Sequence, residues 1–204
     1  MHRSIKRFAL PAAVALALIA GCESSGKDDS SSSSSSSSAK KMDANDKAAA
    51  VANLKTAAAA STQPKWGKPT GTVTFTPAGD DKVKVAYDLK GLTPGTHGFH
   101  IHEKGDLSAA DFSSAGPHFN PTKHKHAGPD SKDRHAGDLG NIEADTSGNA
   151  KGTVTAEGLS IGGGAANDII GRSIVVHEKA DDLKSDPSGN SGARVAAGVI
   201  EPKK

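Results

Sequence analysis

The chain contains six short runs of β-type sequence, most of them bounded by glycine, proline, aspartate or asparagine. They cover Thr70–Thr76, Lys82–Leu89, His97–His102, Asn149–Ala156, Ile169–His177 and Arg194–Ile200, with fainter alternation at Ala50–Leu54. In the second run, Val83, Val85, Tyr87 and Leu89 fall on one face, and the turn at 77–81 contains Gly79, so the first two runs are predicted to form an antiparallel hairpin. Several short strands at this spacing predict an all-β sandwich or barrel.

The alanine-rich stretch Lys47–Ala60 favours a helix on intrinsic propensity. We nevertheless expect tertiary context to override that preference, because no strong helical periodicity supports it elsewhere. Two long polar segments, Glu103–Gly140 and Glu178–Ala193, are then expected to be loops on a rigid β frame, and long loops of this kind commonly carry function.

Eight of the nine histidines lie between His97 and His177, in segments rich in glycine, aspartate and lysine. His100 and His102 flank one residue of a predicted strand, so both imidazoles point to one face and can share an ion. The candidate metal ligands are His100, His102, His118, His126, His135, Asp138 and His177. Seven donors exceed the four that tetrahedral zinc takes, and imidazole also suits copper, which favours two metal ions with room for a shared ligand.

Two further histidines fit other roles. His97 is offset by three residues from His100 and faces the other way along the strand, so we expect it to be packed or hydrogen-bonded. His124 is flanked by lysines and is expected to be solvated.

The first 21 residues have the form of a secretory signal, with Arg3, Lys6 and Arg7 followed by the thirteen apolar residues 8–20, too few to span a bilayer. The run ends in Leu-Ile-Ala-Gly-Cys, which resembles the lipobox of bacterial lipoproteins, so Cys22 is expected to be acylated. Residues 22–46 include nine consecutive serines and are predicted to be a flexible linker. Residues 47–204 form the expected domain, held at the cell envelope (periplasm or outer membrane) by its lipid.

Charge and cysteine content argue against a nucleic-acid-binding protein and against a disulfide-bonded domain. Loss of Arg3, Lys6 and Arg7 takes the 25 basic residues to 22, against 23 acidic residues, and changes the formal charge from +2 to −1. With 3% aromatic residues and no basic patch, the chain is not expected to bind nucleic acid. Because Cys22 is the only cysteine, no disulfide is expected within the domain.

Five motifs resemble those of the copper/zinc superoxide dismutases. They are Gly98-Phe99-His100-Ile101-His102, Gly116-Pro117-His118-Phe119-Asn120-Pro121 with His126, Arg134-His135-Ala136-Gly137-Asp138-Leu139-Gly140-Asn141, Gly171-Arg172 through His177-Glu178-Lys179-Ala180-Asp181-Asp182, and Gly189-Asn190 through Arg194 to Ile200. The resemblance runs in order over about residues 48–201.

The resemblance implies an eight-stranded Greek-key β-barrel, similar to an immunoglobulin-like sandwich, with two long functional loops. It also implies copper held by His100, His102, His118 and His177, and zinc held by His118, His126, His135 and Asp138, with His118 as the bridge. Asp181 would accept hydrogen bonds from His100 and His126, and Arg194 would guide superoxide, which is converted to hydrogen peroxide and dioxygen. Zinc would be structural, His118 would supply a proton to the peroxide, and the protein, monomer or homodimer, would protect the cell envelope.

The sequence departs from the family at its usual disulfide. Ala197 occupies one half-cystine position, and the other is Leu107 or Phe112, depending on the alignment. Such a bridge contributes about 2 to 4 kcal/mol. We expect one of these two side chains to pack against Ala197 instead, and bound metal to stabilise the fold.

Two other function classes compete with the enzyme. A non-catalytic metal-binding lipoprotein could lack a copper ligand or Arg194, and neither is missing. A surface interaction module that uses the barrel only as a scaffold would not need Asp181. The enzyme is therefore the favoured interpretation.

Overall fold

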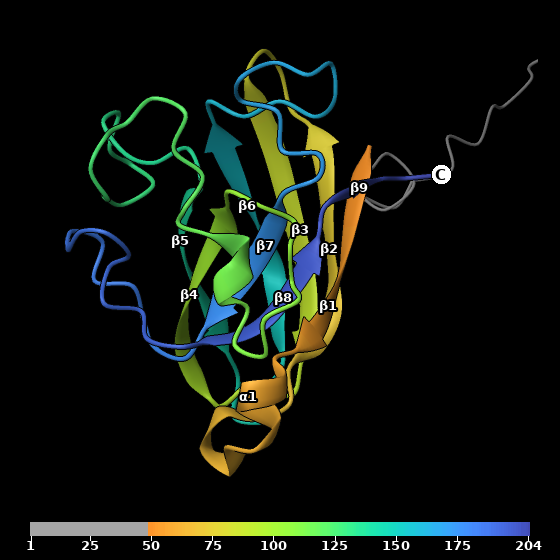
Figure 1. Ribbon diagram of the computed structural model, residues 1–204, viewed down its shortest axis with the longest axis vertical. Helices are drawn as coiled ribbons and strands as arrows, with labels where there is room; N and C mark the ends of the chain where they lie inside the picture. Colours follow the sequence, from red (N-terminus) through yellow and green to blue (C-terminus); the bar gives the residue numbers. More distant parts are fainter. Residues whose placement is uncertain (1–48) are drawn as a thin grey trace, which may run out of the picture. The chain divides into compact units, whose positions relative to one another are not determined.

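The computed structural model describes residues 49–204 (Figure 1). The strands are β1 (Ala50–Thr56), β2 (Thr70–Pro77), β3 (Lys82–Lys90), β4 (Gly95–His102), β5 (Asp138–Ala144), β6 (Ala150–Glu157), β7 (Ser173–His177), β8 (Arg194–Val199) and β9 (Glu201–Pro202). One short helix, α1 (Ala58–Ser61), and two 3-10 turns, η1 (Pro64–Trp66) and η2 (Ser113–Ala115), complete the described elements. The expected signal segment 1–21, Cys22 and the linker 22–46 lie outside these residues.

Eight antiparallel strands form a nearly closed barrel. Their order is β5-β4-β7-β8-β1-β2-β3-β6, and β9 pairs beside β1. The end strands β5 and β6 contact each other without a hydrogen-bonded ladder. The consecutive strands β3 and β4 are not paired, nor are β6 and β7, so these connections cross the barrel in the manner of a Greek key. The predicted all-β barrel is confirmed.

The barrel interior explains the alternation of the sequence. Val83, Val85 and Leu89 of β3 are each at most 1% exposed, while the lysines between and beside them face solvent. β3 pairs with β2 in a hairpin that ends at Pro77 opposite Val83, as predicted. Phe99 and Ile101 of β4 are fully buried, so the strand that carries two histidines is held by the core.

Apart from shifts of one or two residues, three segments differ from the sequence prediction. β5 begins at Asp138, inside the segment expected to be a loop up to Gly140. β7 begins at Ser173 rather than Ile169, because residues 169–172 form a turn in which Gly171 has a φ of 77°. The alanine-rich stretch is extended in β1, as expected, but its last residues form α1.

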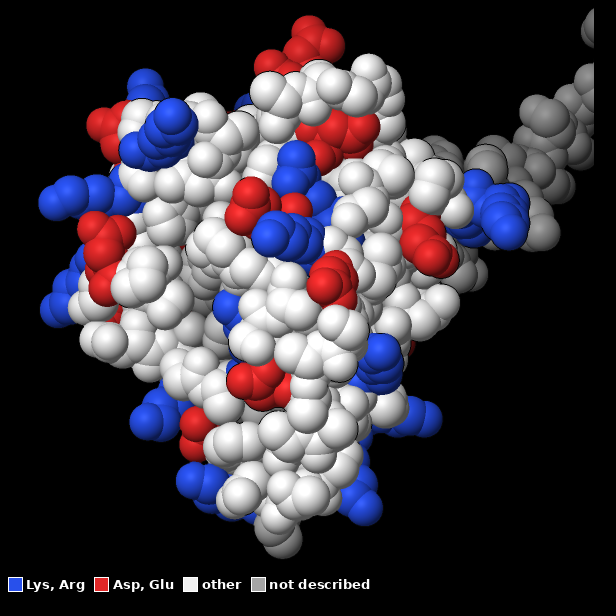
Figure 2. Space-filling view, viewed as in Figure 1, with Lys and Arg blue, Asp and Glu red and all other residues white. Residues whose placement is uncertain are grey.

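Two loops extend from the barrel and carry the polar residues of interest. The first loop, residues 103–137, joins β4 to β5, and the second loop, residues 178–193, joins β7 to β8. Figure 1 shows the two loops on the same side of the barrel. Acidic and basic side chains alternate over the face drawn in Figure 2, which has no broad patch of one sign. Among residues 49–204, no helix has the length and apolar character needed to cross a membrane.

Candidate metal centre

Four buried histidines form the first group of potential ligands. His100 and His102 come from β4, His177 ends β7, and His118 comes from the first loop. One ring nitrogen of each lies within 4.8 Å of those of the others. His100 and His102 therefore turn toward one side of their strand, as the period-two geometry predicted.

Backbone carbonyls orient two of these rings. The Nδ1–H of His102 donates to the oxygen of Gly116 (2.9 Å), and that of His177 donates to the oxygen of Gly192 (3.3 Å). The Nε2 atoms of the two rings then carry lone pairs and lie 3.3 Å apart. Burial lowers the pKa of both histidines well below the ordinary value, assisted by neighbouring charges. Both rings are thus neutral at neutral pH and able to bind a cation.

Three histidines and one carboxylate form the second group. The Nδ1 atoms of His118, His126 and His135 lie 2.8, 3.0 and 3.2 Å from the same Oδ1 atom of Asp138. The other oxygen of Asp138 accepts the backbone N–H groups of Ala127 (3.2 Å) and His135 (3.0 Å). These bonds leave Oδ1 directed at the three rings.

His118 belongs to both groups. Its Nδ1 faces Asp138, while its Nε2 is buried without a hydrogen-bond partner. Three more buried ring nitrogens make no hydrogen bond of good geometry: His100 Nδ1, His126 Nδ1 and His135 Nδ1, although the last two lie 3.0 and 3.2 Å from Asp138 Oδ1. An unpaired buried polar atom is costly, so converging lone pairs of this kind fit cation ligands. The imidazole-rich group suits copper, and the group with three imidazoles and one carboxylate suits zinc.

Backbone hydrogen bonds place the His118 segment against β4 and the start of β5. The N–H of Phe119 donates to Ile101 (2.8 Å), that of Ile101 to Gly137 (2.9 Å), and that of Gly137 to Phe119 (2.9 Å). A Cβ atom on Gly137 would lie 2.2 Å from the oxygen of Ile101. Glycine is required here because the three segments approach too closely for a side chain.

Asp181 connects the two groups through the second loop. Its Oδ2 accepts from His100 Nε2 (2.8 Å) and its Oδ1 from His126 Nε2 (2.9 Å), the two bonds that the resemblance implied. Asn141 of β5 holds the Asp181 backbone by donating to its oxygen (2.9 Å) and accepting from its nitrogen (2.7 Å). Each histidine thereby presents Nδ1, the unpaired atom, to its group.

The charges of these groups are coupled. Burial raises the pKa of Asp138 and Asp181, but hydrogen bonds from the histidines outweigh it and hold both carboxyl pKa values far below their usual range. Burial lowers the pKa of His126, but bonds to Asp138 and Asp181 outweigh it and raise that pKa to about 10. His118 behaves differently, because burial prevails and lowers its pKa to about 4. Of His118 and His126, it is therefore His126 that keeps a proton at neutral pH when no metal is bound.

Arg194, at the start of β8, lies beside the first group. Its Nη1 donates to the oxygen of Phe112 (2.5 Å) and its Nη2 to that of Gly116 (2.7 Å), the carbonyl that also holds His102. Its positive charge contributes to the low pKa of His102, after burial and the charge of His118. A fixed guanidinium at this position can attract a small anion.

His97 and His124 belong to neither group. The ring nitrogens of His97, which is 2% exposed, lie 2.7 and 2.8 Å from the carbonyl oxygens of His177 and Thr93. His124 is partly exposed, and its Nδ1 lies 3.8 Å from Asp133. Both positions agree with the roles expected for these residues.

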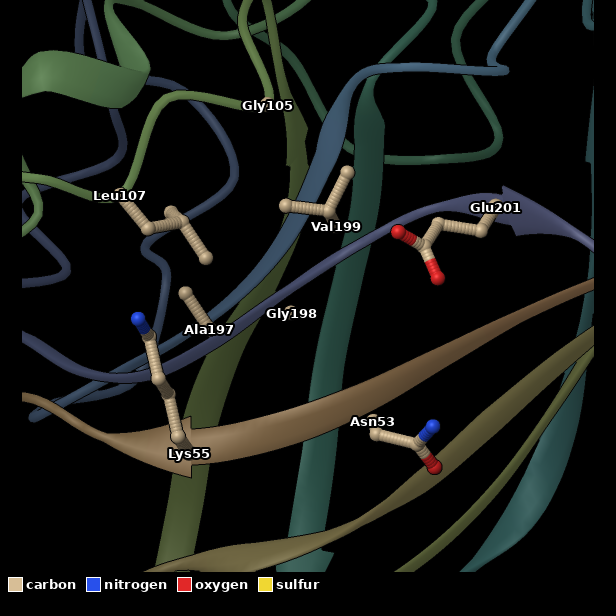
Figure 3. Close-up of a pocket in the computed structure, with 8 residues that line it drawn as sticks. All are labelled: Asn53, Lys55, Gly105, Leu107, Ala197, Gly198, Val199 and Glu201. Atoms are coloured by element: carbon tan, nitrogen blue, oxygen red, sulfur yellow. The ribbon is translucent and has the colours of Figure 1, made fainter.

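The positions expected for the family disulfide hold apolar residues. Leu107 and Ala197 line one pocket of about 370 Å³, and their side chains point toward each other in Figure 3. Phe112 is buried, at 3% exposure, in the same core cluster as Ala197. The first loop is also held by noncovalent bonds, including Ser173 Oγ to the oxygen of Lys104 (2.7 Å). The arrangement agrees with an apolar contact in place of the covalent link.

The barrel and the paired groups define a β-barrel protein with two adjacent sites that could each hold a metal ion, and comparisons with known proteins identify its family. The family model of copper/zinc superoxide dismutase matches residues 69–200. The chain therefore belongs to the copper/zinc superoxide dismutase family. One similar solved structure is described as a crystal structure analysis of the clock protein EA4. Its sequence is 40% identical and the TM-score is 0.66, and the match covers 77% of this chain and 96% of that chain.

Sequence reasoning did not find every residue that shapes the site. Gly189 packs against Asp181 so closely that a Cβ atom would lie 1.8 Å from Oδ1. Asn141 was noticed only as part of a motif, although it fixes the backbone of Asp181. The positive φ of 63° at Gly189 requires glycine in a way that no local pattern could separate from other loop glycines.

Proposed function

We propose that this protein disproportionates superoxide at the cell envelope, with copper held by His100, His102, His118 and His177 and zinc by His118, His126, His135 and Asp138. The supporting observation is the shared His118 ring, whose two nitrogens face two different groups of ligand atoms. In the balanced reaction, two superoxide anions and two protons give one hydrogen peroxide and one dioxygen. Copper, when bound, supplies the chemistry by alternately accepting and returning one electron, which zinc cannot do.

The residues of the chain have separable tasks in this proposal. Arg194 attracts and orients the anion, and the two carbonyls that it contacts hold its guanidinium in place. His118 Nε2 is the atom at which a proton can be held and then donated to the peroxide. Asp181 fixes the tautomers of His100 and His126, and burial of the rings excludes water from the ligand atoms.

Metal analysis and an activity assay of the full chain test the enzymatic proposal. We expect one copper and one zinc per chain, activity that disappears when copper is removed, and activity that returns on copper addition. His118→Ala should lose the coupling between the two metals, whereas His124→Ala, which changes a partly exposed histidine outside both groups, should behave like the wild type. Activity that persists without copper, or unchanged metal binding by His118→Ala, would refute the proposal.

We also propose that Cys22 carries a lipid that anchors the domain to the membrane of the cell envelope. The basic start, the short apolar run and the lipobox-like sequence support this proposal. Cys22→Ser should move the protein from the membrane fraction to the soluble fraction without changing its metal content. Equal membrane recovery of both forms would contradict lipid anchoring.

A further inference from the structure

The connection between β1 and β2 is longer than its geometry requires. The two strands are antiparallel neighbours, with Leu54 opposite Gly71, and a two-residue turn can join such strands. Here residues 57–69, called the β1–β2 arm below, form α1 and η1 instead. Figure 1 shows α1 at the end of the barrel, beyond the last residues of β1. The extra residues call for a structural reason.

One end of the arm contacts the first loop and the start of β8. The N–H of Ala57 donates to the oxygen of Val195 (2.9 Å), next to Arg194 in sequence, and the N–H of Ala59 donates to that of Ala110 (2.9 Å). Ala57 and Ala60 are fully buried, so this end is packed as well as hydrogen-bonded. Ala110 lies two residues before Phe112, whose carbonyl accepts from Arg194.

The other end of the arm contacts the second loop at Glu178. The indole N–H of Trp66 is buried and makes no hydrogen bond of good geometry, but it lies close enough to the Glu178 carboxylate to lower its pKa. Lys65 Nζ lies 3.7 Å from Glu178 Oε1 and 5.4 Å from the centre of the Trp66 ring. Burial raises the pKa of Glu178, but Trp66, Ala193 and the nearby lysines outweigh it and keep the pKa below its ordinary value.

Glu178 joins the two ends of the second loop. Its backbone N–H donates to the oxygen of Ala193 (2.7 Å), and its carboxylate accepts from the N–H of Ala193 (3.5 Å). Glu178 directly follows His177, and Ala193 directly precedes Arg194. Gly192, beside Ala193, supplies the carbonyl that orients the His177 ring.

We infer that the β1–β2 arm is a brace that joins the two loops of the metal centre, with Trp66 as a positioning residue for His177 and Arg194. The brace supplies a noncovalent connection in a domain whose described residues contain no cysteine. The role assigned to Arg194 rests on the proposed function, but the mechanical connection does not. The competing explanation is that Trp66 only fills space at the edge of the core, against which it packs.

Amide hydrogen exchange of the full chain, without metal and with zinc, separates these explanations. In Trp66→Ala, residues 109–116 and 178–193 should exchange about tenfold faster, while β2, β3 and β6 keep their protection. Trp66→Phe keeps the ring and loses the N–H, so we expect a smaller change. Thr62→Ala is the matched control, because Thr62 lies in the same arm and its side chain donates only to the oxygen of Ala59 within the arm. Faster exchange throughout the barrel, or unchanged loops, would overturn the brace.

A second measurement covers the case in which Trp66→Ala does not fold. Glu178→Gln keeps an acceptor oxygen but removes the charge beside the indole, and Trp66 is the only tryptophan in the chain. Its fluorescence should therefore shift in Glu178→Gln and should report zinc loading in the wild type. Neither shift would be expected if Trp66 were independent of the second loop, and their absence would refute the inference.

Azide binding to the copper- and zinc-loaded protein reports on Arg194 without requiring turnover. We expect Trp66→Ala to bind azide about three- to tenfold more weakly than Thr62→Ala, because the guanidinium is less fixed. Unchanged azide affinity would overturn the positioning role of Trp66. If the wild type lacked dismutase activity but both loops responded in hydrogen exchange, the proposed function would fail while the brace remained.

Discussion

Replacing Gly189 by alanine should disturb both halves of the metal centre through one carboxylate. The added Cβ would lie 1.8 Å from Asp181 Oδ1, 2.6 Å from its Cγ and 2.7 Å from His126 Nε2. An ordinary contact needs at least 3.4 Å, so the carboxylate or the backbone of the loop must move. Either movement weakens the bonds of Asp181 to His100 and His126, which are 2.8 and 2.9 Å long.

The expected magnitude follows from these contacts. The φ of 63° costs an alanine about 1 to 2 kcal/mol relative to glycine. Loss of one charge-assisted hydrogen bond costs about 1.5 to 3 kcal/mol, so the metal-free protein should lose roughly 3 to 5 kcal/mol of unfolding free energy. Because Asp181 orients one histidine of each group, we expect zinc affinity to fall about 10- to 100-fold.

Denaturant unfolding and zinc titration against a competing chelator measure these two effects. Gly164→Ala is the matched control, since its φ is 69° and a Cβ atom there meets no atom within 4 Å. That variant should show the backbone strain alone and bind zinc normally. The reasoning fails if Gly189→Ala binds zinc as tightly as the wild type, or if Gly164→Ala loses equal affinity.

Two further predictions concern protons and the missing disulfide. Below pH 10 the metal-free protein holds a proton on His126, whose pKa is raised to about 10, and zinc must displace it. Zinc affinity should therefore rise about tenfold per pH unit between pH 7 and 9, with about one proton released, and calorimetry that shows no dependence on buffer ionisation would contradict this. Phe112→Ala should cost about 3 to 5 kcal/mol of unfolding free energy because Phe112 is 3% exposed, whereas Leu107→Ala should cost about 1 kcal/mol because Leu107 lines an open pocket. If denaturant unfolding of the metal-free forms showed equal losses of free energy for Phe112→Ala and Leu107→Ala, the reasoning from the exposure of these two side chains would be wrong.

Strands with one buried face were predictable, whereas strands shaped by the site were not. In β3, every second residue from Val83 to Leu89 turns inward, so the sequence alternates between apolar and polar residues and the strand can be predicted from it. β5 lacks that pattern because Asp138 and Asn141 serve the metal centre and Gly140 has a φ of 80°. The start of β7 was predicted too early because Ile169 is apolar and buried like a strand residue, although it lies in the turn before the strand.

The candidate ligands could be predicted from residue type, order and family resemblance, and so could the two bonds of Asp181, but the other contacts that support the site could not. The strand period alone placed His100 and His102 on one face. The close approaches of Gly137 and Gly189, and the contact between Trp66 and Glu178, join residues far apart in the chain. No local sequence pattern reports such distances, so these interactions emerged only from the tertiary structure.

The carbonyl of Gly116 links the position of the His102 ring to that of the Arg194 guanidinium. It accepts one bond from the ring of His102 and another from the guanidinium of Arg194. A backbone shift at this single peptide would thus move a potential metal ligand and the Arg194 guanidinium at the same time. Under the proposed function, a sequence change that moves this peptide is therefore expected to alter the redox potential of the metal and the capture of superoxide together.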